Sequence, residues 1–423
     1  MLIKKWLLVV FLFTGWLPAL RADLVYVCNS ATNTISVINT ATNSVVATVS
    51  TNPFGNPSGI AFTPNGQLGY IMGTSPPFNL VGVLDVATNT IVHTVGLSGT
   101  GGLGFTAVTA DGNFVYVTVP SAGLVNVIRT SNNTIAATIT VGTQPTGLAI
   151  APNGRVYVCN QLSDNVSVID SGSNTVIATV SPGAASRPIF CSVTSDGSKV
   201  YVTDLGTNAV SVISTGSNTI TATVSGVLGP TGITITPSNF AYVVNVNSTV
   251  SVIDTTTNTH TATITVGSSG GNSSYDSVTT SGSFVTVSNR AANTVSLINT
   301  SSNTVVATLA VGTSPFGSAA IPTNIPTPSS LGPTGFQLAN RFLTQTDFVN
   351  IISWNAPSNF TPTSYKIFRD AANTTLAGTV SGSTLEFEDH NRVKKVFYTY
   401  FIVAVNAAGT TLNIGSIVVE PIM

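Results

Sequence analysis

The sequence predicts an all-β chain, in which a seven-bladed β-propeller with four-stranded blades is followed by a β-sandwich. Three observations support this prediction. A strand motif recurs seven times at intervals of 41 to 46 residues, each interval has room for four short β runs, and a non-repeating β segment follows a Pro-rich stretch near the C-terminus. The repeat therefore indicates the architecture clearly and the chemistry hardly at all.

The recurring motif is a Tyr-Val strand that ends on a polar residue in most copies. It reads Val25–Asn29, Tyr70–Gly73, Tyr116–Val119, Tyr157–Asn160, Tyr201–Asp204, Tyr242–Asn245 and Thr286–Asn289. The leading positions, from Tyr26 to Thr286, are 44, 46, 41, 44, 41 and 44 residues apart. We interpret this motif as the second of four strands in each repeat.

The other three runs of each repeat have their own signals. The first run ends in turns such as Asn65-Gly66 and Asp111-Gly112, whose residues supply the positive φ of a tight hairpin. The third run is typified by Val166–Ile169, and the fourth by Val45–Val49. A hairpin with an asparagine connects the third and fourth runs in every copy: Asn43, Asn89, Asn133, Asn174, Asn218, Asn258 and Asn303.

The phase of the repeat predicts how the ring closes. The chain starts with a second run and the last unit ends with a first run, so residues 316–321 are predicted to form the innermost strand of the blade that residues 24–49 complete. Such closure leaves no open edge within the ring. An open β-solenoid is the alternative, but it does not need matched ends.

The repeat resembles the YVTN-type β-propeller repeats of bacterial surface-layer and secreted proteins. The resemblance rests on the Tyr-Val-x-Asn strand, the Pro-Asn-Gly turn and the Val-Ser-Val-Ile-Asp segment, and it covers residues 24 to about 322. The chain departs from the pattern at Gly73, Val119 and Thr286. The resemblance implies a propeller fold, but related propellers serve as adhesins, structural coats and, less often, enzymes.

Residues 1–22 are predicted to be a signal peptide. Lys4 and Lys5 form a positive segment, an apolar segment runs from Trp6 to Leu20, and Ala22 offers a small residue at a cleavage site. An uncleaved anchor is the alternative. No later segment is long and apolar enough to span a bilayer, so we expect an exported protein, secreted, periplasmic or on the cell surface, with no transmembrane segment after cleavage.

Composition narrows the possible partners. Charged residues make up only 7% of the chain, and residues 23–323 carry five Lys or Arg against nine Asp and no Glu, a net charge of −4. No basic face exists to attract phosphates, which argues against nucleic-acid binding. The predicted propeller, residues 23–322, must instead present mainly Thr, Ser and Asn.

The three cysteines do not form a disulfide framework. Cys28 and Cys159 occupy the same repeat position three blades apart, so a bond between them is geometrically implausible. Cys159 and Cys191 fall in neighbouring blades, and the sequence leaves their pairing open. Buried, inert thiols are the simplest expectation.

A second domain is predicted after a Pro/Ser-rich linker at residues 323–333. Residues 334–423 contain seven short strand signals, and their Trp354 strand, Tyr365–Phe368 strand and Tyr398/Tyr400 strand resemble a fibronectin type III module. The resemblance implies that Trp354 is the core tryptophan and that Tyr398 or Tyr400 is the corner tyrosine. It also implies an extracellular spacer or binding module.

Catalytic and metal-binding patterns are scarce. His93 and His260 lie in outer strands, His390 lies in a charged loop, and no Asp-rich calcium loop or Cys-x-x-Cys pair occurs. We predict no cofactor and no metal site. An enzyme of the propeller lactonase or lyase kind is the alternative, and it would need a polar cluster at the channel mouth, for which the candidates are Asp204, Asp276, Arg187 and Arg290.

One face of the predicted disc is the candidate binding surface. The connections after runs two and four emerge on the same side and escape the repeat, and loops of this kind carry function in propellers. They contain aromatic and basic side chains suited to anchoring a partner: Phe54, Phe78, Arg187, Tyr275, Arg290 and Phe316. The alternative for each phenylalanine is loop packing against neighbouring blades.

The sequence thus predicts an exported or cell-surface binding protein that recognises a protein, a glycan or an envelope component. A propeller lactonase or lyase and a structural coat protein are the two alternatives. The oligomeric state and the identity of the partner are left open.

Overall fold

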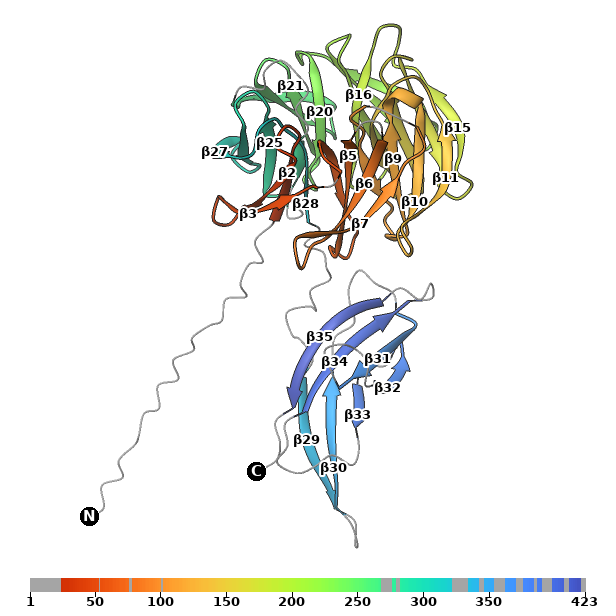
Figure 1. The fold of residues 1–423 in the computed structure, drawn as a ribbon, viewed down its shortest axis with the longest axis vertical. Coiled ribbons are helices and arrows are strands. Elements are labelled where there is room, and N and C mark those ends of the chain that lie inside the picture. Colours follow the sequence, from red (N-terminus) through yellow and green to blue (C-terminus); the bar gives the residue numbers. More distant parts are fainter. Residues whose placement is uncertain are drawn as a thin grey trace, which may run out of the picture. The chain divides into compact units, whose positions relative to one another are not determined.

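The computed structural model describes residues 24–52, 54–75, 78–99, 102–267, 276–278, 282–321, 334–341, 346–353, 362–369, 376–383, 386–389, 398–406 and 411–419. They form two compact units, one with the strands β1 to β28 and one with β29 to β35 (Figure 1). Within these ranges every regular element is a strand except a short 3-10 turn, η1 (Pro120–Ala122). The all-β prediction is confirmed. The predicted signal peptide and linker lie outside the described residues.

The first unit is built from four-stranded antiparallel sheets. One sheet contains β28 (Pro315–Ala320), β1 (Leu24–Asn29), β2 (Thr34–Asn39) and β3 (Ser44–Ser50). The next three contain β4 (Pro57–Phe62), β5 (Leu68–Ser75), β6 (Phe78–Asp85) and β7 (Thr90–Gly96); β8 (Thr106–Val108), β9 (Phe114–Val119), β10 (Leu124–Arg129) and β11 (Thr134–Thr140); and β12 (Pro145–Ile150), β13 (Arg155–Asn160), β14 (Asn165–Asp170) and β15 (Thr175–Val180). The last three contain β16 (Pro188–Val193), β17 (Lys199–Asp204), β18 (Ala209–Ser214) and β19 (Thr219–Val224); β20 (Pro230–Ile235), β21 (Phe240–Asn245), β22 (Thr249–Asp254) and β23 (Thr259–Thr265); and β24 (Asp276–Val278), β25 (Phe284–Asn289), β26 (Thr294–Asn299) and β27 (Thr304–Ala310).

The two ends of this unit meet in one sheet. Strand β28 pairs antiparallel with β1, with Val25 opposite Ala320 and Val27 opposite Ser318. Figure 1 shows the teal β28 close to the red strands of the first sheet, whose order is β28-β1-β2-β3. The first strands of successive sheets also contact one another in a closed cycle, β28 to β4, β8, β12, β16, β20, β24 and back to β28. This is a propeller-like repeat architecture.

Cores form between adjacent sheets. One core combines Tyr26 and Ile35 of the first sheet with Phe62 and Ile71 of the next. Both faces of the inner strands are therefore buried, which explains why their sequences are β-branched throughout and do not alternate apolar with polar residues.

A hydrogen bond between neighbouring sheets recurs around the unit. In six of the seven sheets, the buried tyrosine of the second strand donates its hydroxyl to the hairpin asparagine of the next sheet. The pairs are Tyr26–Asn89 (2.7 Å), Tyr70–Asn133 (2.8 Å), Tyr116–Asn174 (2.7 Å), Tyr157–Asn218 (2.9 Å), Tyr201–Asn258 and Tyr242–Asn303 (2.6 Å). Each of these asparagines, and Asn43 as well, has a φ near +50°, a conformation that asparagine tolerates well. Six of the seven hairpin asparagines thus have two structural roles, and Asn43 has only the positive φ.

The outermost strand of each sheet carries a β-bulge. One residue of the fourth strand has no partner on the third strand: Val46, Val92, Ala136, Ile177, Thr221, Thr261 or Val306. A bulge breaks the regular edge and so discourages uncontrolled pairing with other strands.

The second unit contains two antiparallel sheets. One consists of β29 (Thr334–Arg341), β30 (Thr346–Ser353) and β33 (Glu386–Asp389), and the other of β32 (Leu376–Ser381), β31 (Ser364–Phe368), β34 (Tyr398–Val405) and β35 (Thr411–Val419). Tyr365, Ile367, Tyr400 and Ile402 are buried in its core. The predicted core residue Trp354 and the side chain of Tyr398 lie outside the described residues.

Candidate binding face

The candidate surface, here called the loop face, consists of two kinds of segment in the first unit. The turns that follow the second strands contribute residues 30–33, 120–123, 161–164, 205–208, 246–248 and 290–293. The connections that lead into the next sheet contribute the described residues of 51–56, 97–105, 141–144, 181–187, 225–229 and 311–314. The opposite ends of the sheets carry the tight hairpins, here called the turn face.

Hydrogen bonds join the segments of the loop face. Four of the turns donate a backbone N–H to the connection that enters their own sheet: Ser30–Ser314 (3.1 Å), Gln161–Gln144 (3.0 Å), Leu205–Arg187 (3.3 Å) and Val246–Gly229 (3.0 Å). A side chain of the turn then accepts from the connection that enters the next sheet, as in Asn33–Asn56 (2.7 Å), Asp164–Arg187 (2.8 Å), Asn208–Gly229 (2.7 Å) and Asn293–Ser314 (2.8 Å). The loops differ in sequence, but their backbones are fixed by one repeated arrangement.

The residue that precedes five of the innermost strands turns the chain sharply. These corner residues have positive φ and stand directly before a proline: Asn56 (36°), Gln144 (54°), Arg187 (49°), Gly229 (65°) and Ser314 (60°). Non-glycine residues in this conformation are uncommon and tend to occur at functional sites. Arg187 is the charged member of this set, and its side chain is exposed.

Phe54 is not a surface residue. Its side chain is fully buried, and a Cβ placed on Gly73 or Gly82 would lie 2.3 Å or 2.1 Å from its ring. The missing side chains of these two glycines therefore make room for the Phe54 ring on one face of the β5–β6 pair. The expectation that Phe54 anchors a partner is corrected: its role is loop packing, the alternative considered from the sequence.

Phe316 is also buried, in a cluster that the sequence did not reveal. Its ring stacks on Phe105 with centroids 5.9 Å apart, and Phe105 meets the edge of Phe190 at 5.2 Å. The three rings come from β28, from the residue before β8, and from β16, which are not neighbours in the cycle of first strands. Gly147 of the intervening strand β12 leaves room for the Phe190 ring, because a Cβ on Gly147 would lie 2.3 Å from Cδ2 of Phe190.

Arg290 lies over this cluster. Its guanidinium carbon is 5.1 Å from the centroid of Phe316, and its Nε donates to Ser314 Oγ at 2.9 Å. Among the described residues no acceptor bonds its two Nη groups. Arg290 is therefore held in place by Phe316 and Ser314 while part of its guanidinium is available.

Three other candidate residues lie wholly or partly outside the described residues. Tyr275 lies outside the described residues, and so do the side chains of Phe78 and Asp276. Among the candidate residues that the structure describes, Arg290 and Phe316 are brought together.

Asp204, a candidate for the enzymatic alternative, lies inside a sheet. Its side chain is buried, and Ser211 Oγ donates to it at 2.5 Å. Burial raises the pKa of Asp204 to about 7, and the hydrogen bond from Ser211 opposes this rise. Within the described part of the chain no ion pair joins Asp204 to Arg187 or Arg290.

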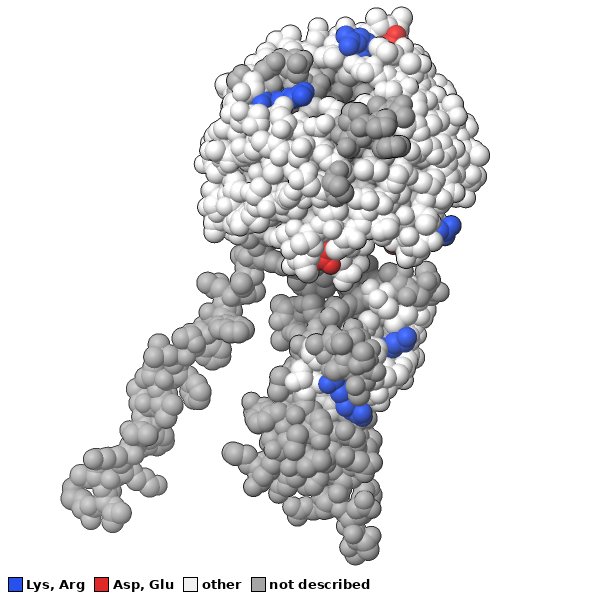
Figure 2. Space-filling model, in the orientation of Figure 1, with Lys and Arg blue, Asp and Glu red and all other residues white. Residues whose placement is uncertain are grey.

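The charges of the first unit are unevenly distributed between its faces. Five aspartates lie in turns of the turn face and accept backbone or hydroxyl hydrogen bonds there: Asp85, Asp111, Asp170, Asp196 and Asp254. Three basic side chains, Arg129, Arg155 and Lys199, share that face. Arg155 donates to the carbonyl of Thr215 and Lys199 to that of Thr255. Figure 2 shows that coloured side chains are sparse on the visible side of this unit. Arg187 and Arg290 are accordingly the cations of the loop face.

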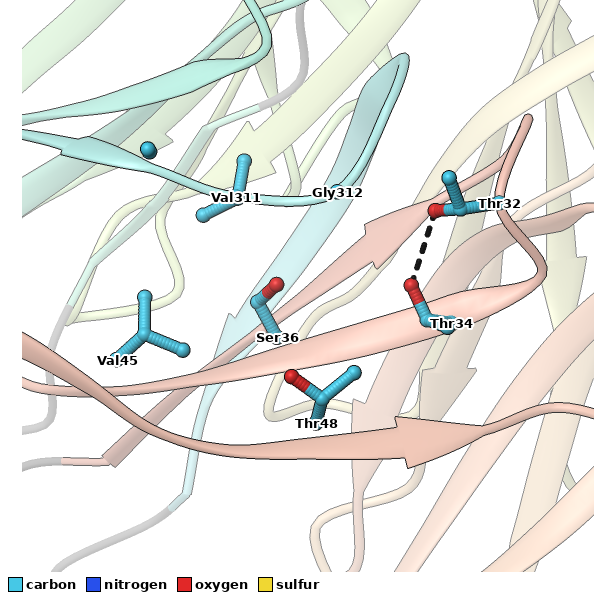
Figure 3. Close-up of a pocket in the computed structure, with 8 residues that line it drawn as sticks. Thr32, Thr34, Ser36, Val45, Thr48, Val311 and Gly312 are labelled. Atoms are coloured by element: carbon cyan, nitrogen blue, oxygen red, sulfur yellow. Dashed lines mark hydrogen bonds between the residues drawn. The ribbon is translucent and has the colours of Figure 1, made fainter.

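A shallow groove lies at the junction of the first and last sheets. It has a volume of about 370 Å³ and is lined by hydroxyls of Thr32, Thr34, Ser36 and Thr48 and by Val45, Ala310, Val311 and Gly312. Figure 3 shows these hydroxyls and the bond between Thr32 and Thr34. Nothing in this groove suggests catalysis. Among the described residues there is also no cluster of three metal-ligating side chains.

No helix in the described ranges has the length and apolarity required to cross a membrane.

Comparison with known proteins gives likeness of fold only. No family model matches the chain, and no curated protein matches it. Among solved structures, hydrazine synthase of Kuenenia stuttgartiensis is 18% identical with a TM-score of 0.55, over 63% of this chain and 90% of that one. A protein of unknown function from Desulfotomaculum acetoxidans is 16% identical with a TM-score of 0.58, over 71% and 99%. At this identity the likeness supports the propeller-like architecture and carries no function.

Proposed function

We propose that this chain is an exported seven-bladed propeller of the YVTN type with a C-terminal fibronectin type III-like module. We further propose that it binds a protein, a glycan or an envelope component through the loop face of the propeller. Each part of this proposal has its own support.

The seven-bladed ring is supported by the described sheets. The four-stranded sheets of the first unit correspond one for one to the seven repeats, and their first strands contact one another in a closed cycle. The YVTN assignment rests on the repeated motifs alone. The fibronectin-like assignment is supported by the three-stranded and four-stranded sheets of the second unit and by the buried Tyr400.

Export is supported by the sequence of residues 1–22 and by a surface poor in charge and rich in Thr, Ser and Asn. It predicts that the mature chain starts at Asp23. Sequencing the N-terminus of protein recovered from culture medium or periplasm tests this part alone.

Binding through the loop face is carried by one observation: Arg290 is positioned on a rigid backbone with its Nη groups open among the described residues. Stacking on Phe316 and the bond to Ser314 lower the entropy that this side chain would lose on binding. Its planar donors suit carboxylates, sugar hydroxyls and backbone carbonyls. Arg187 adds a second exposed guanidinium to the same face.

The test measures binding of residues 23–423 to an array of glycans and envelope components. Arg187→Ala and Arg290→Ala should weaken any specific interaction at least tenfold. Arg129→Ala is the matched control, because Arg129 stacks on Phe114 at 5.4 Å in the same way but belongs to the turn face. Loss of binding in Arg129→Ala alone, or binding unaffected by both loop-face changes, would overturn the loop-face assignment.

A coat-like assembly is the second candidate, favoured by the outer strands. The bulged residues Val46, Val92 and Val306 are 51%, 56% and 45% exposed, and they lie on outer strands of consecutive sheets, which contact one another. The seven outer strands contain no Lys, Arg, Asp or Glu. Exposed valines on uncharged strands favour lateral association through side chains, which does not need the strand pairing that the bulges discourage. Light scattering should then show concentration-dependent assembly that Val46→Thr with Val306→Thr reduces; a monomer at all concentrations would exclude this candidate.

A further inference from the structure

Two buried cysteines of neighbouring sheets lie close together. Cys159 belongs to β13 and Cys191 to β16, strands that contact each other. Both residues share one hydrophobic core, with exposures of 0% and 2%. The Sγ of Cys191 donates to the carbonyl oxygen of Tyr157 at 3.5 Å, and Tyr157 is two residues before Cys159 on β13.

The strand geometry explains this proximity. Tyr157 and Cys159 are two residues apart on β13, so their side chains leave the same face of the sheet. That face packs against the next sheet, where Cys191 is the fourth residue of its first strand. Both thiols therefore occupy the same layer between the two sheets.

The repeat supplies an internal control for this position. Cys28 is the equivalent of Cys159 in β1, and the residue equivalent to Cys191 in the next sheet is Ile60. Cys28 and Ile60 share one core, just as Cys159 and Cys191 do. The layer is thus normally apolar, and only the β12–β15 and β16–β19 sheets place a thiol on both sides of it.

We propose that Cys159 and Cys191 become joined by a disulfide bond that links the β12–β15 sheet to the β16–β19 sheet. The structure holds both as free thiols. The proposal rests on the export part of the proposed function, because disulfides persist in oxidising compartments.

The oxidant is a small-molecule or protein disulfide, such as oxidised glutathione. The thiolate of one cysteine attacks the external disulfide, which releases one reduced thiol and leaves that cysteine in a mixed disulfide. The second cysteine then attacks the sulfur of the first cysteine and releases the other reduced thiol. Two cysteine thiols are oxidised, one external disulfide is reduced to two thiols, and their protons go to those thiols or to solvent. No other reactant is needed.

Burial dictates when this reaction takes place. Burial and the neighbouring thiol raise the pKa of Cys159 well above its ordinary value, so the folded protein contains very little thiolate at this site. The exchange should therefore occur during folding, before the two sheets dock. Once formed, the bond is shielded from external reductants for the same reason.

The test counts free thiols. Protein exported to a bacterial periplasm is purified without reductant, unfolded in guanidinium with iodoacetamide, and weighed by mass spectrometry. The expected result is one alkylated cysteine, Cys28, and a chain lighter by two hydrogens than the reduced form. Cys28→Ser should leave none alkylated, and Cys159→Ser should leave two.

A second preparation tests the disulfide independently of whether the protein is exported. The reduced chain is refolded in a buffer of reduced and oxidised glutathione, whatever its natural compartment. One alkylated thiol here supports the bond even if the N-terminus proves uncleaved in cells. Three alkylated thiols in both preparations, from protein with an intact β fold by circular dichroism, would overturn the disulfide.

Discussion

The hydroxyl of Tyr116 donates to Oδ1 of Asn174, 58 residues later, at 2.7 Å. Five other tyrosines make the same bond to the next sheet, and the sheet of β24 to β27 is the exception because Thr286 stands where the others have tyrosine. Its counterpart, Asn43, is exposed, whereas the six bonded asparagines are partly buried. The junction between the last and first sheets therefore lacks an element that the others share.

Removing one of these hydroxyls should destabilise the first unit modestly. We expect Tyr116→Phe to lower the free energy of unfolding by about 1 kcal/mol, the usual net value of a hydrogen bond. The measurement is urea denaturation of single and double variants. The partner change is Asn174→Gly, which keeps the positive φ of 54° that alanine would strain. Additive effects in Tyr116→Phe/Asn174→Gly would show that the bond contributes nothing.

Restoring the absent tyrosine should have the opposite effect. Thr286→Tyr is expected to raise the free energy of unfolding by about 0.5–1 kcal/mol, because the new hydroxyl finds Asn43 and the ring buries apolar area. Part of this gain should disappear in the Asn43→Gly background. Destabilisation of equal size in both backgrounds would mean that the site has no room for the ring.

Gly147 is predicted to be required for the packing of the aromatic cluster. Gly147→Ala places a Cβ 2.3 Å from Cδ2 of Phe190 and should cost about 1–3 kcal/mol of stability. Adding Phe190→Ala should cost less in this variant than in the wild type, because the clash with the ring is gone. Gly96→Ala is the control, since no atom lies within 4 Å of its Cβ position. Equal melting temperatures for Gly147→Ala and Gly96→Ala would refute the packing argument.

Asp204 should make stability depend on pH near neutrality. Its pKa is about 7 in the folded protein and near 3.8 when unfolded, so the folded state binds the proton more tightly. The contribution of Asp204 to the free energy of unfolding should therefore be highest below pH 4. It should fall by about 2–4 kcal/mol as the pH rises to 7. Denaturation between pH 5 and 8 measures this slope.

The control for this prediction is Asp204→Asn. Other sheets carry asparagine here, and Asn160 Nδ2 donates to Ser167 Oγ at 2.9 Å, so the variant should fold with a similar bond to Ser211. The five aspartates of the turn face have lowered pKa values, that of Asp196 being about 2, so their contribution is lost only at lower pH. A slope between pH 5 and 8 that persists in Asp204→Asn would assign it to another group.

The position of a candidate residue could be predicted from the sequence only where the chemistry of its side chain restricted its environment. Arg187 and Arg290 could be placed on one face from strand phase alone, because a guanidinium seldom enters a core and four-stranded repeats fix which ends of the strands meet. Phe54 and Phe316 could not be assigned this way, since a phenylalanine in a loop suits both a partner and the interior. Phe105 and Phe190 went unnoticed because nothing in their local sequence shows that three distant segments converge.

The sequence by itself determined the repeat, the all-β architecture and the pairing of the chain ends, because strand periodicity and turn chemistry are local properties that recur seven times. Only the tertiary structure decided that Phe54 is buried, that Phe316 packs against Phe105, that Arg290 stacks on Phe316 and that Cys159 and Cys191 share one core. These contacts join residues of different sheets. They depend on the distance and rotation between neighbouring sheets. The side-chain volumes of the whole unit determine this distance and rotation, so no local sequence pattern predicts them.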